Sequence, residues 1–158
     1  MNEILKIIIL TLLPFLELRA SIPYGVFNTG LSLWVIFTVA VVTNIILAKI
    51  IFLFLHKLMH LFLRIGWINK VYNKLVLRTQ KKVHPYVEKY GVIGLALFIG
   101  IPLPGSGVYS GALGAYFLGF SYKDFFKAAV IGVLIAGIVV LIASTIGNGV
   151  WNIFIKNT

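Results

Sequence analysis

The hydrophobic positions along the chain form two long uninterrupted runs and two runs that proline, glycine or charge interrupts. Residues 31–55 carry one charged side chain, Lys49, in 25 positions, and residues 128–146 carry none in 19. A helix needs about 20 apolar residues to cross the hydrocarbon core of a bilayer. Each of these runs therefore predicts a transmembrane helix.

The two interrupted runs predict a different structure. Residues 4–16 are too short to cross a bilayer, and Glu17 and Arg19 follow them directly. Residues 91–122 carry no charge, but the prolines and glycines of residues 102–107 interrupt them in the middle. Irregular backbone at membrane depth is tolerated where protein buries it or where it lines a wet cavity. Both runs therefore predict re-entrant hairpins.

Basic residues gather in the centre of the chain. Eight of the fourteen lysines and arginines lie between Lys57 and Lys89, as is typical of a cytoplasmic segment beside anionic headgroups. Four of them recur at intervals of four residues, which places them on one helix face (Lys70, Lys74, Arg78 and Lys82). The pattern predicts an amphipathic interfacial helix, and a flexible basic linker is the alternative.

The order of these segments predicts an all-α polytopic membrane protein. Residues 1–158 form one membrane domain, with a first hairpin and span over 1–62, a basic interfacial helix over 63–90, and a second hairpin and span over 91–158. Each half places a serine and a proline at a break before a long helix. With one crossing per half, the second half is inverted and both termini lie outside. Inverted repeats with broken helices are typical of transporters.

Small residues at four-residue spacing predict close helix packing in the second half. They form two ridges, one of Gly107, Gly111, Ala115 and Gly119, and one of Ala128, Gly132 and Ala136. The residues from Gly147 onward are expected to form a short tail with an interfacial anchor. In the first span, Thr43 and Asn44 are expected to bond across helices.

Composition supports the membrane assignment and narrows the chemistry. The chain is 60% hydrophobic and 11% charged, with a mean hydropathy of +1.03, whereas soluble domains carry about 25% charged residues. The net charge of +10 is therefore interpreted as a sign of contact with anionic lipid headgroups and not of nucleic-acid binding. The absence of cysteine excludes disulfides and thiolate metal sites. With three histidines and four acids, we expect no enzyme, no metal and no cofactor. The expected partners are membrane lipids and a lipid or small-molecule substrate, and a homodimer is compatible with this size.

Glu17 and Arg19 are the strongest candidates for function. An ionisable residue at the centre of a membrane helix costs at least about 2.5–3.5 kcal/mol, so it needs a partner or a role. Glu17 is interpreted as a proton or cation site and Arg19 as an anion-binding group. A surface ion pair between them is the alternative. A break at Ser21-Ile22-Pro23 would let both side chains reach one cavity.

The loop of residues 102–107 is the second candidate. Ser106 is predicted to cap the following helix, whose free backbone donors would favour an anionic headgroup or carboxylate. A purely structural turn is the alternative. The complete predicted site comprises Glu17, Arg19, Ser21, Pro23, Pro102, Pro104, Gly105, Ser106 and Gly107.

Two motifs carry a resemblance to a known family. The segments Glu17-Leu18-Arg19-Ala20-Ser21-Ile22-Pro23 and Pro102-Leu103-Pro104-Gly105-Ser106-Gly107 make the chain similar to the putative small multidrug export protein family, which itself looks like a distant branch of the DedA (VTT-domain) superfamily. The resemblance implies two re-entrant hairpins that face each other in an inverted repeat. It also implies transport of polyprenyl-phosphate carriers or phospholipids by embedded acids and arginines. One departure is that the second hairpin carries no arginine.

The leading interpretation is a small transporter or lipid flippase of a multi-pass cell-membrane type, which moves an anionic lipid and is open to proton coupling through Glu17. The first alternative is proton-coupled export of small organic cations. The second alternative is a non-transporting membrane scaffold that binds a partner.

Overall fold

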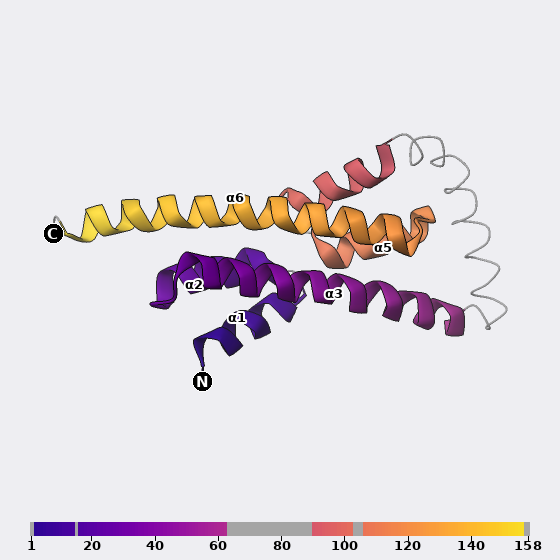
Figure 1. The fold of residues 1–158 in the computed structure, drawn as a ribbon, viewed down its shortest axis with the longest axis horizontal. Coiled ribbons are helices and arrows are strands. Elements are labelled where there is room, and N and C mark those ends of the chain that lie inside the picture. The colour runs from indigo at the N-terminus through magenta and orange to yellow at the C-terminus, as the bar shows by residue number, and fades with distance from the viewer. Residues whose placement is uncertain (1, 15, 63–89, 103–105, 157–158) are drawn as a thin grey trace.

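The computed structural model describes residues 2–14, 16–62, 90–102 and 106–156 (Figure 1). Within these ranges the chain is helical and contains no strand. The helices are α1 (Glu3–Leu12), α2 (Glu17–Asn28), α3 (Leu33–Phe62), an unlabelled helix (Tyr90–Gly100), α5 (Val108–Leu118) and α6 (Tyr122–Lys156). The predicted basic interfacial helix lies outside the described residues, apart from its last position.

Within the described ranges, two helices are long and apolar enough to cross a membrane. They are the parts of α3 and α6 that span Leu33–Leu58 and Tyr122–Gly147, with 26 residues each. At a rise of 1.5 Å per residue each extends about 39 Å, which exceeds the hydrocarbon core of about 30 Å. The two helices lie side by side and run in opposite directions (Figure 1). They contain the apolar runs that the sequence predicts as transmembrane.

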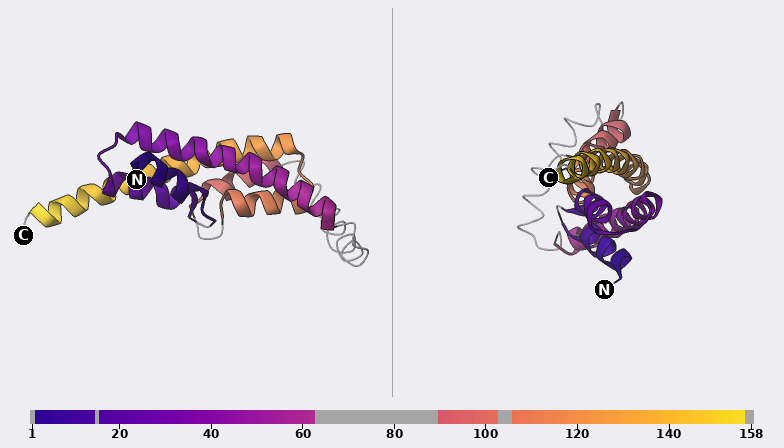
Figure 2. Two further views of the ribbon diagram at one scale, coloured as in Figure 1. Left: turned by 90° about the horizontal axis from the view of Figure 1, so that it is seen from below. Right: turned by 90° about the vertical axis from the view of Figure 1, so that its left-hand side faces the viewer.

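The prediction of a short tail from Gly147 is wrong. Helix α6 continues to Lys156, and its last turns extend beyond the other helices (Figure 2). No proline interrupts residues 147–156. Isolated glycines cost only about 1 kcal/mol each in a helix, so they weaken this helix without ending it.

Among the described residues, many large apolar side chains are exposed, and a few polar side chains are buried within an apolar core. Large exposed hydrophobic side chains cover α3 and α6, among them Trp34, Ile50, Ile138 and Ile146. In the part of the chain whose side chains are described, the buried polar ones are Thr11, Glu17, Ser21, Asn44 and Ser144. This distribution suits a protein whose surface faces lipid, where every buried polar group needs an internal partner.

Four shorter helices in the described ranges form two pairs. The first helix pair is α1 and α2, joined by residues 13–16, and the second helix pair is Tyr90–Gly100 and α5, joined by residues 101–107. The two pairs occupy opposite halves of the molecule, and both termini lie in the half of the first pair (Figure 1). Helix α2 contacts α1, α3 and α6, whereas α5 contacts α3 and α6.

The expected break at Ser21-Ile22-Pro23 is wrong, because α2 continues through Pro23 as a helix. Proline removes one backbone donor from the helix, and the buried Ser21, Ile22 and Gly25 hold this segment against its neighbours. The chain breaks before α2 instead. The break ends at Glu17, whose φ of 47° lies in the left-handed region.

The small-residue ridges mark close helix packing, as the sequence predicts. A Cβ atom added to Gly111 of α5 would lie 2.6 Å from the Ile99 side chain. One added to Gly132 of α6 would lie 2.7 Å from the carbonyl oxygen of Ala96. The helix Tyr90–Gly100 therefore approaches both α5 and α6 at glycines. Gly119 is the exception, because it is an exposed helix end with a φ of 79°.

Candidate functional site

The carboxylate of Glu17 lies at the amino-terminal end of α5. Its Oε2 accepts the backbone N–H of Val108 at 3.1 Å, and its Oε1 accepts the N–H of Tyr109 at 3.2 Å. Glu17 is only 4% exposed. A carboxylate is stabilised here because the first N–H groups of a helix have no internal partners and the helix dipole is positive at this end. Glu17 is therefore the anion that binds this helix end.

Gly107 makes this approach possible. It is the N-cap of α5, has a φ of 125°, and provides no side-chain cap. A Cβ atom at this position would lie 2.7 Å from Oε2 of Glu17, so a larger residue would displace the carboxylate. The prediction that Ser106 caps α5 is wrong, because Glu17 supplies the cap from 91 residues away.

Ser106 bonds elsewhere, together with Arg19. Its hydroxyl donates to the carbonyl oxygen of Ile101 at 2.6 Å and accepts from Nη2 of Arg19 at 2.8 Å. The guanidinium also donates to the carbonyl oxygens of Ser106 at 2.6 Å and Ile101 at 3.2 Å, with a longer contact of 3.5 Å to Ile99. Arg19 thus binds the carboxyl-terminal end of the helix Tyr90–Gly100, where the helix dipole favours a cation.

The two charges therefore hold the two ends of one broken segment. Glu17 accepts hydrogen bonds from the free backbone N–H groups where α5 begins. Arg19 donates to free carbonyl oxygens at and after the end of the preceding helix. A hydrogen bond also runs from the second helix pair to the first. The Tyr109 hydroxyl donates to the carbonyl oxygen of Leu12, at the end of α1, at 2.6 Å. The breaks of the two helix pairs satisfy each other's backbone groups.

Asn44 completes the polar centre from the first span. It is fully buried in α3, and its Nδ2 lies 3.5 Å from Oε2 of Glu17. Its Oδ1 has no hydrogen-bond partner within the part of the chain that the structure describes. The expected bond from Asn44 across helices is confirmed, but its position beside Glu17 was missed. A single amide side chain in the middle of an apolar span could have indicated that Asn44 lies at a polar centre.

The structure brings together only part of the predicted site. Glu17, Arg19, Ser106 and Gly107 meet around the second loop. Ser21 is buried one turn from Glu17, and its hydroxyl bonds that of Thr11 at 2.7 Å, within the first helix pair.

The prolines contribute less. Pro23 lies inside α2 and Pro102 is exposed at the loop, while Pro104 and Gly105 lie outside the described residues. Among the described residues no three acids, histidines or cysteines gather in a way that could hold a metal ion. The centre is thus a set of hydrogen bonds between charged side chains and broken backbone.

Apolar helices long enough to cross a bilayer, exposed apolar side chains, and a buried Glu17 and half-buried Arg19 at helix breaks define a helical membrane protein with a polar centre. The chain belongs to the putative small multi-drug export protein family, whose model matches residues 17–139. That match begins at Glu17 and covers Arg19, Asn44 and the second loop. No curated protein and no solved structure matches the chain.

Proposed function

We propose that this protein is a proton-coupled membrane exporter of small lipophilic compounds, in which Glu17 is the group that takes up and releases the proton. The observation that carries the proposal is the pair of bonds from Glu17 to the N–H groups of Val108 and Tyr109. These bonds join α2 to α5, and they are strongest when the carboxylate is ionised. Protonation of Glu17 would therefore loosen the second helix pair from the first.

Asn44 suits both protonation states of Glu17. In the described state its Nδ2 is the group that faces the carboxylate. A protonated carboxyl group needs an acceptor, and rotation of the Asn44 amide would supply Oδ1, which is buried without a described partner. A neutral Glu17 could thus remain bonded after it releases α5. This accommodation supports a proton-linked change between two states.

The proposal includes an arrangement in the membrane. The two helix pairs are re-entrant hairpins, related as an inverted repeat, and α3 and α6 cross the cell membrane. The basic segment between Lys57 and Lys89 is cytoplasmic, and both termini lie outside. Movement of the second hairpin against the first would open the polar centre to each side in turn.

The contacts of Arg19 favour this function over a lipid flippase. An anionic polyprenyl phosphate or phospholipid would need the guanidinium, but Arg19 already donates to Ser106 and Ile101. An anion would have to break these bonds, whereas a cation or a neutral compound would not. We therefore place the anionic lipid second as a substrate. A non-transporting scaffold is the remaining alternative.

Transport by Glu17→Gln in proteoliposomes tests the proposal. Wild-type protein should move tetraphenylphosphonium across the membrane in exchange for protons that flow down an imposed gradient. The variant should lose this dependence on the gradient because its amide does not titrate. Glu3→Gln is the matched control. It makes the same change at a partly exposed acid that bonds Lys6 and Tyr24, and it should behave as wild type.

Three results would contradict the proposal. Unchanged gradient dependence in Glu17→Gln would remove Glu17 from coupling. Transport of a polyprenyl phosphate but not of the phosphonium by wild-type protein would favour the flippase. Transport of neither probe would favour the scaffold.

A further inference from the structure

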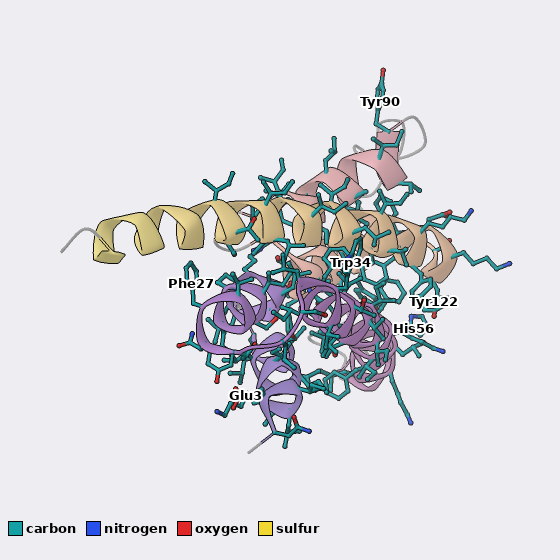
Figure 3. All side chains as sticks on the ribbon, turned by 60° about the vertical axis from the view of Figure 1, so that its left-hand side comes forward. Glu3, Phe27, Trp34, His56, Tyr90 and Tyr122 are labelled. Carbon is teal, nitrogen blue, oxygen red and sulfur yellow. The ribbon has the colours of Figure 1, made fainter. Side chains whose placement is uncertain are left out.

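A separate cavity lies at the end of the molecule where α3, α5 and the start of α6 meet. Its volume is about 390 Å³, near the lower end of the range of about 300–1,000 Å³ found for small-molecule sites. Aromatic side chains form most of its lining, namely Phe52, His56, Tyr116, Phe120 and Tyr122. Figure 3 shows His56 and Tyr122 together at this end.

The rings of this cavity are inclined to one another. Phe52 and Tyr122 have centroids 6.0 Å apart with planes at 52°, and His56 and Tyr116 meet edge to face at 6.2 Å. Phe125 stacks on one face of Phe52 at 4.5 Å and Phe126 on one face of Tyr122 at 5.8 Å, so at most one π face of each of these rings is open to the cavity. Such faces attract a cation that lies within about 6 Å of a ring centroid.

The end of α5 and the start of α6 both lie at the cavity. Gly119, which ends α5, is part of the lining, so the negative end of that helix dipole lies at the cavity. Ser121 also lines the cavity and donates to the carboxylate of Asp124 at 2.7 Å. Among the described residues that line the cavity there is no lysine or arginine. The positive end of the α6 dipole also lies here, at Tyr122, and Asp124 in the first turn of α6 offsets it. The ring faces, in a described lining without lysine or arginine, therefore favour a cation over an anion.

We propose that this aromatic cavity binds a small organic cation, such as a quaternary ammonium compound with one aromatic ring. Its use in transport rests on the proposed function, whereas the binding itself does not. The cavity lies where the first span ends near Leu58 and the second begins at Tyr122. This is the side on which the basic segment follows α3. A cytoplasmic basic segment makes the cavity the site at which an exporter takes up its substrate from the cell.

Binding of radiolabelled benzyltrimethylammonium to the full-length protein in detergent tests the site. Neopentylbenzene has the same shape without the charge, so in wild-type protein it should compete at least about ten-fold more weakly than the unlabelled cation if ring faces recognise charge. This comparison needs no variant and is independent of any effect on folding. Equal competition by the two compounds would overturn the assignment to cations.

Variants locate the binding. Tyr122→Leu and Tyr116→Leu should each weaken binding about ten-fold, and the matching changes to phenylalanine should restore it to within about three-fold, because phenylalanine keeps the π face. Tyr90→Leu is the control, since Tyr90 is exposed and points away from the helices, apart from His56 and Tyr122 (Figure 3). An equal loss in Tyr90→Leu, or no loss in both cavity variants, would overturn the site.

Two measurements on wild-type protein separate this inference from the proposed function, namely binding of benzyltrimethylammonium and the dependence of transport on the proton gradient. Normal binding together with transport that ignores the proton gradient in wild-type protein would refute the coupling and leave the binding site intact. Gradient-driven transport without binding in this cavity would refute the site and leave the coupling intact.

Discussion

Replacement of Glu17 by glutamine should lower the stability of the protein, because it removes a buried charge that holds α5. The carboxylate accepts two backbone N–H groups, one on each oxygen. Glutamine keeps nearly the same shape, but it offers a single acceptor oxygen and turns an –NH₂ group toward the second donor. One of the two N–H groups is then left without a partner in a buried position.

The size of the effect follows from these two bonds. A hydrogen bond to a charged group contributes about 1.5–3 kcal/mol and a neutral one about 0.5–1.5 kcal/mol. Loss of one bond and weakening of the other therefore cost roughly 2.5–4 kcal/mol. Removal of a buried charge returns part of its desolvation cost, which leaves a net loss of about 2–3 kcal/mol. For a chain of this length, 1 kcal/mol changes Tm by about 2–4 °C, so Tm should fall by about 4–12 °C.

Thermal unfolding of the purified protein in detergent measures this change. Glu3→Gln makes the same chemical change at a partly exposed side chain and should leave Tm within a degree or two of wild type, since solvent replaces the lost contacts. A Tm for Glu17→Gln equal to that of Glu3→Gln would refute the reasoning. It would mean that the carboxylate does not hold α5 in the folded protein.

Two further changes address the same centre. Arg19→Ala should lower Tm by several degrees, because it removes the guanidinium bonds to the second loop, and Arg19→Lys should recover part of the loss, because an ammonium lacks the planar fork. Neither change should make polyprenyl phosphate a worse substrate relative to a cation. A selective loss of polyprenyl-phosphate transport would favour the lipid flippase as the function. Gly107→Ala should cost at least about 1–2 kcal/mol in unfolding free energy from its positive φ alone. Gly114→Ala in the same helix, with open space around it, should not lower Tm, and equal effects of the two would contradict the close contact with Glu17.

The polar centre shows how one short chain can tolerate two helix breaks in an apolar setting. Each break exposes backbone groups that lipid cannot satisfy. Here the Glu17 carboxylate and the Arg19 guanidinium of the first helix pair bond backbone groups of the second. The Tyr109 hydroxyl of the second pair donates to the Leu12 carbonyl oxygen of the first. The charges that first suggest a substrate site therefore also hold the fold together. A change in the charge of Glu17 would act on both, which is the basis of the proposed coupling.

The sequence by itself determined the helical class and the two long helices, because both depend on local properties. A predominantly apolar run of about 20 residues satisfies its backbone in lipid by forming a helix, so residues 31–55 and 128–146 can be assigned without knowledge of their packing partners. The importance of Glu17 and Arg19 is readable in the same way, since a charge in an apolar run is costly wherever it packs. The family match over residues 17–139 includes both of these residues.

Only the tertiary structure decided which groups these charges bind. The sequence predicts Ser106 as the cap of α5 because capping is normally local, whereas the cap is Glu17, 91 residues away. The sequence also predicts a break at Pro23, but buried neighbours keep α2 helical there and the break ends at Glu17. Asn44 beside Glu17 and the aromatic cavity both require α3 to pack against helices distant in sequence. Such contacts depend on how the helices meet, and no local pattern of hydrophobic and polar residues specifies that.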